Sequence, residues 1–289
     1  MQTLHANGID VAYEAFGDPA DPAMLLIMGL GTQMLAWPDE LCEDLAGRGH
    51  HVIRFDNRDV GLSTHLTGVR APTIAELALR RQTPPYTIDD MADDAVGLMD
   101  ALDLESAHVV GASMGGFIAQ AVALGHRGRV RSLTLIMTST GSRTVGNPKP
   151  RLFSRLTKRR AVADRESATS MALETFRIIG SRGYAFDEEY LSQVAARSYD
   201  RAHDPGGYLR QLSAIMAQPD RTKQLQQLRV PALVMHGLDD PLVAISGGLA
   251  LAQALHHSRF VGFEGMGHDL PRELWPGFAE HIARLADRA

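Results

Sequence analysis

The stretch that decides the fold of this chain reads Val109-Val110-Gly111-Ala112-Ser113-Met114-Gly115-Gly116-Phe117. It places Gly-x-Ser-x-Gly between an apolar, β-branched run and a segment of small and apolar residues. The pattern predicts a strand that turns sharply into a helix at Ser113, with glycines two residues away on each side because a Cβ there would collide with neighbouring backbone. The helix dipole and the free N–H groups of its first turn favour negative charge, so Met114 N–H is a candidate donor to an oxyanion.

A serine hydroxyl is a weak nucleophile, so chemistry at Ser113 needs a histidine base and a carboxylate that orients the histidine. Near the end of the chain, Gly265-Met266-Gly267-His268-Asp269 places a histidine in a glycine-punctuated loop. The loop follows the apolar segment 259–263, which is predicted to be the last strand. We therefore predict His268 as the base.

The acid is expected earlier in the chain, where the predicted strand 232–236 runs into a loop that contains Asp239 and Asp240. Adjacent side chains point in different directions, so only one of the two carboxylates can reach His268. We predict Asp240 as the acid and Asp239 as a loop-capping or solvent-facing residue. His236 is a second candidate base, but it ends a buried strand and is expected to be structural.

The order serine, acid, histidine, with each residue after a predicted strand, resembles the α/β-hydrolase superfamily. The superfamily spacing His-Gly-x-x-Asp selects Asp240. The stretch Met28-Gly29-Leu30-Gly31 resembles the oxyanion loop of the family, with a methionine where a histidine is common. The resemblance implies Leu30 N–H as the second oxyanion donor, beside Met114 N–H.

A narrower resemblance rests on the same loop together with three further features. Asp56-Asn57-Arg58-Asp59-Val60-Gly61-Leu62-Ser63 is similar to the Asp-x-Arg-Gly-x-Gly-x-Ser loop of many members, with Asp59 in place of the first glycine. Trp37-Pro38 and the Gly-Met-Gly-His loop complete the set. The combination most resembles capped small-ester hydrolases of the aclacinomycin methylesterase kind. A serine at the turn argues against the epoxide hydrolases and haloalkane dehalogenases of this superfamily, which use an aspartate there.

Strand-like and helix-like segments alternate along most of the chain. Strands are predicted at residues 9–16, 24–27, 52–56, 108–110, 133–138, 232–236 and 259–263, and helices at 38–47, 88–102, 114–125, 247–254 and 273–286. This alternation predicts an α/β fold: a mostly parallel sheet with helices on both faces and the first strands antiparallel at one edge. The resemblance implies the eight-stranded sheet of the α/β-hydrolase fold, with the proposed triad at the carboxyl ends of strands.

The alternation breaks between residues 140 and 228, where helix-like stretches dominate. We predict a helical cap at 140–228, inserted into a hydrolase core of residues 1–139 and 229–289. A cap of this kind should lie over the pocket, where its apolar residues could line the cavity that binds substrate. The alternative is that each of them only packs the cap against itself and the core. The residues expected to contact substrate are Gly29, Trp37, Phe153, Phe176 and Met216.

Composition limits the class of protein. The chain has 289 residues, enough to bury a large core, and its net charge of −5 gives no reason to expect a nucleic-acid partner. Its single cysteine, Cys42, cannot form an intrachain disulfide and is expected to be a small core residue. A basic run at 143–165 is expected to be a solvated helix face, with attraction to an anionic substrate or membrane surface as the alternative.

No signal-like segment and no run long enough to span a bilayer stands out, so a cytoplasmic location without stable membrane insertion is expected. The acidic cluster at 89–94 is explained as a solvated first helical turn, and we predict neither a metal nor a cofactor. The partner is expected to be a small-molecule ester, and a homodimer is left open.

The sequence thus predicts a serine hydrolase that cleaves small to medium carboxylic esters, apolar acyl or methyl esters, through an acyl-enzyme on Ser113. The same triad serves lactone, thioester and carbon–carbon bond hydrolysis and perhydrolysis, because specificity lies in the cap and pocket. A hydrolase-like receptor that binds a ligand without turnover is a third class. Multiple turnover of a simple ester would separate the enzyme from the receptor.

Overall fold

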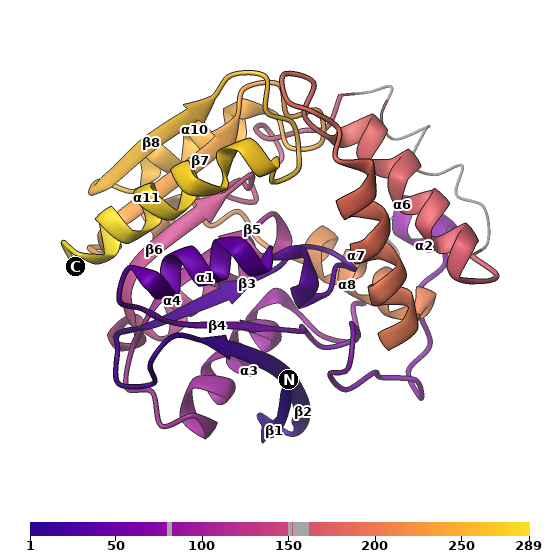
Figure 1. Cartoon of the computed structure of the whole chain (residues 1–289), viewed down its shortest axis with the longest axis horizontal. Coiled ribbons are helices and arrows are strands. Elements are labelled where there is room, and N and C mark those ends of the chain that lie inside the picture. Colours follow the sequence, from indigo (N-terminus) through magenta and orange to yellow (C-terminus); the bar gives the residue numbers. More distant parts are fainter. Residues whose placement is uncertain (80–82, 150–151, 153–161) are drawn as a thin grey trace.

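The computed structural model describes residues 1–79, 83–149, 152 and 162–289 and contains one eight-stranded sheet (Figure 1). The strand order is β1-β2-β4-β3-β5-β6-β7-β8, and every pairing from β4 to β8 is parallel, whereas β1 and β2 are antiparallel at one edge. The strands are β1 Gln2–Ala6, β2 Ile9–Phe16, β3 Ala23–Ile27, β4 His51–Phe55, β5 Ala107–Ala112, β6 Val130–Ile136, β7 Ala232–Gly237 and β8 Ser258–Phe263. The predicted sheet class and antiparallel edge are confirmed.

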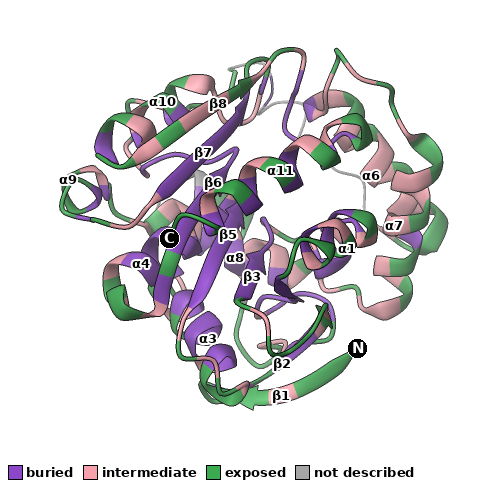
Figure 2. Cartoon of the chain, turned by 60° about the vertical axis from the view of Figure 1, so that its left-hand side comes forward, coloured by how far each residue is buried: buried purple, intermediate pink, exposed green. Residues whose placement is uncertain are grey.

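The first strand, β1, has no counterpart among the seven segments predicted from hydrophobic pattern. Its sequence, Gln-Thr-Leu-His-Ala, is mixed in polarity, and most of it is exposed at the sheet edge (Figure 2). It is held by backbone pairing with β2, in which Leu4 lies opposite Val11. An edge strand of this kind buries little apolar surface, so hydrophobic periodicity carries almost no signal for it.

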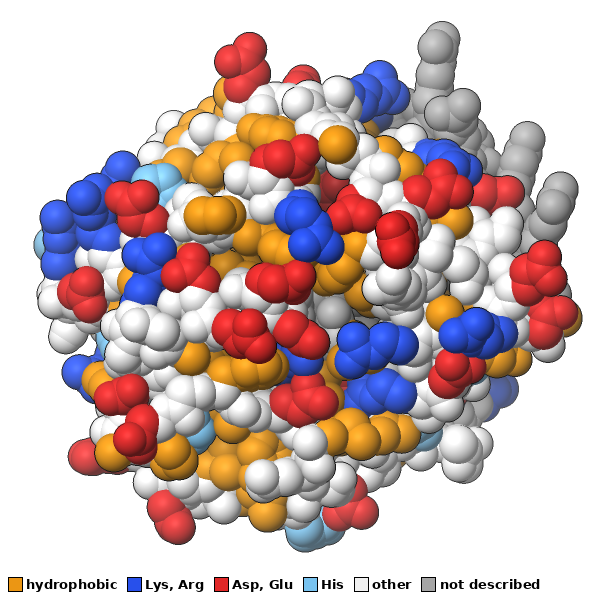
Figure 3. All heavy atoms as spheres, in the orientation of Figure 1, with side chains coloured by type: hydrophobic (Ala, Val, Ile, Leu, Met, Phe, Trp, Pro, Cys, Tyr) orange, Lys and Arg blue, Asp and Glu red, His pale blue; other side chains and the backbone are white. Residues whose placement is uncertain are grey.

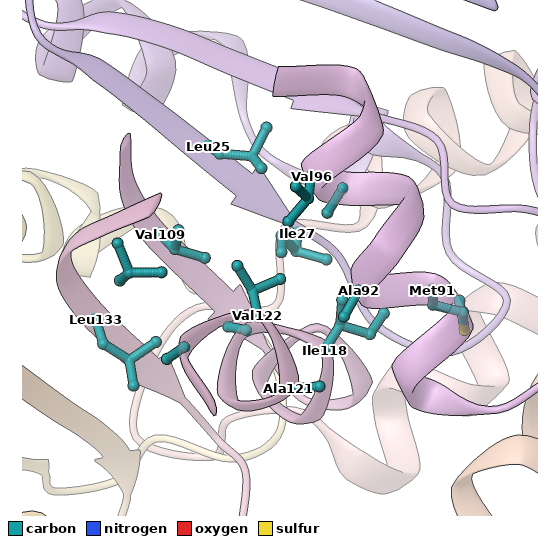
Figure 4. Packing of buried hydrophobic residues seen from close by; sticks show 14 of the residues in the cluster. Leu25, Ile27, Met91, Ala92, Val96, Val109, Ile118, Ala121, Val122 and Leu133 are labelled. Atoms are coloured by element: carbon teal, nitrogen blue, oxygen red, sulfur yellow. The ribbon is translucent and has the colours of Figure 1, made fainter. Parts of the chain in front are cut away.

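Helices cover both faces of the sheet, as predicted. One face packs against α3, α4 and α10 and the other against α1 and α11. Figure 4 shows apolar side chains of the strands, among them Ile27 and Val109, facing Val96 of α3 and Ile118 and Val122 of α4. The bounds are α1 Asp39–Gly47, α2 Ile74–Leu79, α3 Ile88–Ala101, α4 Met114–Gly125, α10 Ile245–Ala254 and α11 Trp275–Ala286.

The acidic cluster at the start of α3 is only in part the solvated helix face that we predicted. Asp90 forms a capping box with Thr87, which satisfies backbone donors of the first turn. Asp94, by contrast, is buried, and its carboxylate accepts hydrogen bonds from Arg58 at 2.5 and 2.6 Å and from Asn7 at 2.8 Å. The prediction was wrong for this residue because the partner cation lies 36 positions away in the chain.

Cys42 lies on α1 and is completely buried, as expected. Burial raises the pKa of its thiol to about 12, since a thiolate would lose its solvation there. This keeps the thiol protonated and unreactive.

Between β6 and β7 the described residues form helices and no strand: α6 Arg165–Ile179, α7 Glu188–Arg201, α8 Pro205–Ala217 and the short α9 Thr222–Leu225. Aspartates cap α6, α7 and α8 through Asp164, Asp187 and Asp204. Figure 1 shows α6, α7 and α8 together on the right, beyond the carboxyl end of the sheet. We refer to these three helices as the cap; the boundaries 140 and 228 stay a prediction.

Buried ion pairs tie the cap to the core. Arg210 of α8 donates to both carboxylate oxygens of Asp59, at 2.7 and 2.8 Å, and to Asp204 at 2.8 Å. Asp59 also accepts from the amide of Leu66 and the hydroxyl of Tyr86. Although burial alone would raise the pKa of Asp59, these donors together hold it below its usual value.

Replacing Arg210 with methionine, which keeps much of the volume, is expected to lower the free energy of unfolding at pH 7 by about 3–5 kcal/mol, because the buried carboxylate of Asp59 loses its cation. The depressed pKa gives stability that is present above the unfolded-state pKa of about 4 and is lost as the pH falls through the lower folded-state value. Urea unfolding of both proteins at pH 7 and pH 3 measures this.

The matched control is Arg165→Met, which removes the exposed ion pair with Asp200 and should cost no more than about 1 kcal/mol. Equal losses from the two substitutions would contradict a stabilising role for the buried pair.

On the face seen in Figure 3, acidic and basic side chains are interspersed, without a continuous surface of one sign. In the part of the chain that the structure describes, each helix is too short or too polar to cross a membrane.

Candidate active site

Ser113 occupies the strained turn that the sequence predicts. Its backbone has φ 55° and ψ −117°, a conformation that residues other than glycine rarely adopt. The turn follows directly on β5 and starts α4, and Ser113 N–H donates to the carbonyl of Ile136 in β6 at 2.9 Å. Strain of this kind persists only where the surrounding structure enforces it, and here it exposes the hydroxyl above the sheet.

The glycines on each side of Ser113 permit this turn. A Cβ at Gly111 would lie 2.2 Å from the carbonyl oxygen of Gly115, and one at Gly115 would lie 2.0 Å from that of Ile27. Both distances are far below van der Waals contact, and the neighbours are backbone atoms that cannot rotate away. The spacing of the motif therefore has a steric cause in this fold.

Ser113, His268 and Asp240 form one hydrogen-bonded chain. His268 Nε2 lies 3.0 Å from Ser113 Oγ, and His268 Nδ1 lies 2.7 Å from Asp240 Oδ2. Asp240 is buried, and its other oxygen, Oδ1, accepts from the amides of Leu242 and Val243 at 2.8 Å each. Since the ionised carboxylate can only accept, Nδ1 carries the proton and Nε2 is left to accept from the serine.

The neighbouring candidates take other positions. Asp239 is exposed, so the structure brings Asp240 and not Asp239 to the histidine. His236 is completely buried, and its Nε2 lies 2.8 Å from the carbonyl of Val243 and 3.8 Å from Asp240 Oδ2. Burial lowers the pKa of His236, so it is neutral and serves as a packing neighbour of the acid.

The loop after β3 lies directly beside the serine. A Cβ at Gly29 would sit 3.2 Å from Ser113 Cβ and 3.6 Å from its Oγ, so this glycine leaves room next to the hydroxyl. Leu30 follows Gly29 in that loop, and Met114 is the first residue of α4. The two amides predicted as oxyanion donors thus belong to the two segments that meet at Ser113.

The loop that carries His268 is hydrogen-bonded to the last residue of α6 and to the chain segment that follows it. His268 N–H donates to the carbonyl of Ile179 at 2.8 Å, and the amide of Gly267 donates to Ser181 Oγ at 2.9 Å. Ser181 in turn donates from its amide and its hydroxyl to Asp269 Oδ1. The cap therefore helps to fix the backbone on both sides of the histidine.

The residues predicted to contact substrate lie in different places. Trp37 is completely buried among apolar residues and packs the core in this structure. Phe176 is half-buried on α6, one turn before the end of that helix, and Met216 lines a recess of about 170 Å³ with Phe117 and Ile215. The triad is not part of the lining of that recess. Phe153 lies outside the described residues.

One cluster has the composition of a metal site. Asp59, His65 and Asp204 offer ligand atoms within 4.8 Å of one another. Arg210, however, already pairs with both carboxylates, and His65 makes hydrogen bonds to Asp204 and to the carbonyl of Gly61. A cation here would have to displace the guanidinium, so the cluster is an ion-pair network.

Several residues that shape the site carry no local sequence signal. Gln211 of α8 accepts from the amide of Gly31 at 2.7 Å, and Arg201 of α7 donates to Asp56 at 2.8 Å and to Gln33 at 2.7 Å. Each of these contacts joins positions more than 140 residues apart. The local sequence of these helices does not indicate such partners, because the contacts form only when distant parts of the chain fold together.

Comparison with known families identifies the fold. The family described as "alpha/beta hydrolase fold" matches residues 22–271. The chain is an alpha/beta hydrolase. The matched region of this hydrolase includes the turn at Ser113, the acid loop, the His268 loop and the cap, so the resemblance inferred from the motifs is confirmed at the level of the family.

Two curated relatives of the hydrolase bear the name rhodomycin D methylesterase. DauP of Streptomyces sp. strain C5 is 30% identical over 279 residues, which cover 89% of this chain and 88% of DauP. DnrP of Streptomyces peucetius is 28% identical over 276 residues, with coverage of 89% and 88%. Among solved structures, the enol-lactonase from Burkholderia xenovorans LB400 superimposes with a TM-score of 0.76 at 25% identity and covers 99% of this chain and all of its own.

Proposed function

We propose that this hydrolase cleaves carboxylic esters through an acyl-enzyme on Ser113. The observation that carries the proposal is the continuous chain Ser113–His268–Asp240, with distances of 3.0 and 2.7 Å, at a serine held in strained geometry. Geometry of this kind suits general-base activation of a hydroxyl, because the base lies within hydrogen-bond reach of the proton that it removes.

In the first half of the reaction, Ser113 Oγ attacks the ester carbonyl carbon while its proton moves to His268 Nε2. The resulting imidazolium is stabilised by Asp240, and the carbonyl oxygen becomes an oxyanion that the amides of Leu30 and Met114 bind. The tetrahedral intermediate collapses, the bond to the alcohol oxygen breaks, and His268 returns the proton to the departing alcohol. The acyl group remains on Ser113.

In the second half, water takes the place of the alcohol. His268 removes a proton from the water as the water oxygen attacks the acyl carbon, and a second oxyanion forms beside the amides of Leu30 and Met114. Its collapse releases the carboxylic acid and returns the proton to Ser113. All groups are the chain's own, so the proposed reaction requires no cofactor.

We infer further that the preferred substrates are methyl esters of apolar carboxylic acids. The support is the likeness to two proteins named rhodomycin D methylesterase across nine tenths of the chain. Lactone hydrolysis is the second candidate, supported by the likeness to an enol-lactonase structure over the whole chain. The triad chemistry is the same, so the choice between an open-chain ester and a lactone depends on the shape of the pocket.

The test compares kcat/KM for methyl, ethyl and butyl 1-naphthoate and for a lactone, δ-valerolactone, beside p-nitrophenyl esters from acetate to palmitate. We expect the methyl ester to exceed the butyl ester by at least about tenfold, since a few methylenes on the leaving group suffice for such discrimination in a fitted pocket. A higher kcat/KM for the lactone would favour the second candidate. Absence of turnover for all of them would contradict the proposed function.

A further inference from the structure

The side chain of Gln211 joins the cap helix α8 to the two loops beneath it. It is completely buried, and its Oε1 accepts from the amide of Gly31 at 2.7 Å while its Nε2 donates to the carbonyl of Arg58 at 2.8 Å. A buried amide retains a fixed orientation when both of its ends are hydrogen-bonded. Gln211 is thus a rigid connection between the cap and the loop that carries Leu30.

The contact fixes one complete peptide plane of the oxyanion loop. Gly31 N–H and the carbonyl of Leu30 belong to the same planar, trans peptide and point in opposite directions. The N–H is held by Gln211, and the carbonyl accepts from the hydroxyl of Thr32 at 3.0 Å. Rotation of this plane would break both hydrogen bonds at once.

The preceding peptide, between Gly29 and Leu30, is oriented by the same turn. The carbonyl of Gly29 accepts from the amide of Thr32 at 3.3 Å, so Leu30 N–H must point away from Thr32. Gly29 lies against Ser113, so the amide of the residue that follows it belongs to the loop next to a group bound at the serine. The orientation of Leu30 N–H therefore depends on the adjoining plane that Gln211 holds.

The backbone of Gly31 shows why the cap can approach so closely. Its φ is +62°, and a Cβ there would lie 2.5 Å from Cδ2 of Tyr208, one turn before Gln211 on α8. A glycine without a side chain lets α8 pack directly on the loop, so the amide of Gln211 reaches the backbone.

We propose that Gln211 is a positioning residue that holds the oxyanion loop in its reactive orientation from the cap. This inference rests on the proposed ester hydrolysis at Ser113. Gln211 does not touch the reacting atoms; it acts through the Leu30–Gly31 peptide. The cap then contributes to turnover itself, in addition to covering the site.

The test is Gln211→Met, which keeps the length of the side chain and removes both hydrogen bonds. Loss of a whole oxyanion donor costs ~10²–10³ in kcat, and misorientation of one costs less, so we expect kcat per active site to fall by about 10–100-fold with KM within about threefold. Active sites are counted by titration with a fluorophosphonate. Inhibition by phenylboronic acid, whose adduct on Ser113 places an oxygen in the oxyanion site, should weaken by a similar factor.

Two further variants separate positioning from simple stabilisation. Thr32→Val removes the other hydrogen bond to the same peptide plane from a half-buried position, so we expect the same pattern at a smaller size, about 3–10-fold, even where Gln211→Met fails to fold. Ser213 is a buried residue of the same helix whose hydroxyl has no hydrogen-bond partner among the described residues, so Ser213→Ala should leave kcat within about twofold.

Unchanged kcat per active site in both Gln211→Met and Thr32→Val, with only a lower melting temperature, would overturn the proposal and leave Gln211 as a structural tie. Failure of the proposed function looks different, because the wild-type protein would then turn over no ester. In that case the test compares the rates at which a fluorophosphonate labels Ser113 in the wild type and in Gln211→Met. A 10-fold or larger decrease in Gln211→Met supports the inference, and equal rates, or no labelling of the wild type, contradict it.

Discussion

Ser113→Ala is expected to lower kcat for the best ester substrate by about 10⁶, the size of effect seen when the nucleophile of such a triad is removed. The reason is that alanine lacks the Oγ that lies 3.0 Å from His268 Nε2 at the end of the hydrogen-bonded chain. KM should change little, because the hydroxyl contributes to the reaction and only slightly to ground-state binding. The measurement is steady-state hydrolysis of methyl 1-naphthoate by both proteins.

A control must show that the loss of kcat comes from the missing nucleophile and not from unfolding of the variant. The variant keeps a side chain at φ 55° and every neighbouring contact except one hydrogen bond, so its melting temperature should lie within a few degrees of the wild type. Covalent labelling by a fluorophosphonate should disappear. Near-normal turnover by a folded, unlabelled variant would mean that Ser113 is not the nucleophile and would remove the basis of the mechanism.

The parts of the fold that follow from local pattern could be predicted. The buried strands β3 and β5 and the helix α4 lie within a few residues of their predicted bounds, because each is a continuous run of apolar or small residues that is buried along nearly its whole length. The edge strand β1 could not be predicted, since it is held by backbone pairing and buries little apolar surface. Asp94 was misassigned for the related reason that its burial depends on a distant arginine.

The candidate site divides in the same way. Ser113, Asp240 and His268 are recognisable because each follows a strand in a motif of fixed spacing, and the sheet brings the strand ends together. The polar residues of the cap and of the segment after α6 are not recognisable, since Gln211 and Ser181 contact loops that are distant in sequence. Pocket-lining residues are the hardest case, because an apolar residue in a cap helix looks the same whether it faces substrate or core.

Asp59 departs from the loop pattern that this stretch of the chain resembles. The loop that this stretch resembles has glycine there in many members, and Asp59 has φ +66°, the left-handed conformation that glycine adopts without strain. Aspartate tolerates this conformation better than most residues, and here its carboxylate receives Arg210 from the cap. The strain at one residue is therefore offset by an ion pair that joins two parts of the chain.

Asp240→Asn is expected to lower kcat by about 10⁴ while leaving the fold intact. The structure gives the reason. Oδ1 of Asp240 accepts from the amides of Leu242 and Val243, so an asparagine must place its oxygen there and direct its NH₂ group at His268. His268 Nδ1 would then have to accept a hydrogen bond, which moves the ring proton to Nε2, and that nitrogen could no longer take the proton of Ser113.

The matched control is Asp239→Asn, which makes the same chemical change at the adjacent, exposed position and should leave kcat within about twofold. Both variants are assayed on methyl 1-naphthoate, with melting temperatures measured in parallel. A large loss of kcat in Asp239→Asn together with a small loss in Asp240→Asn would show that Asp239, and not Asp240, is the acid.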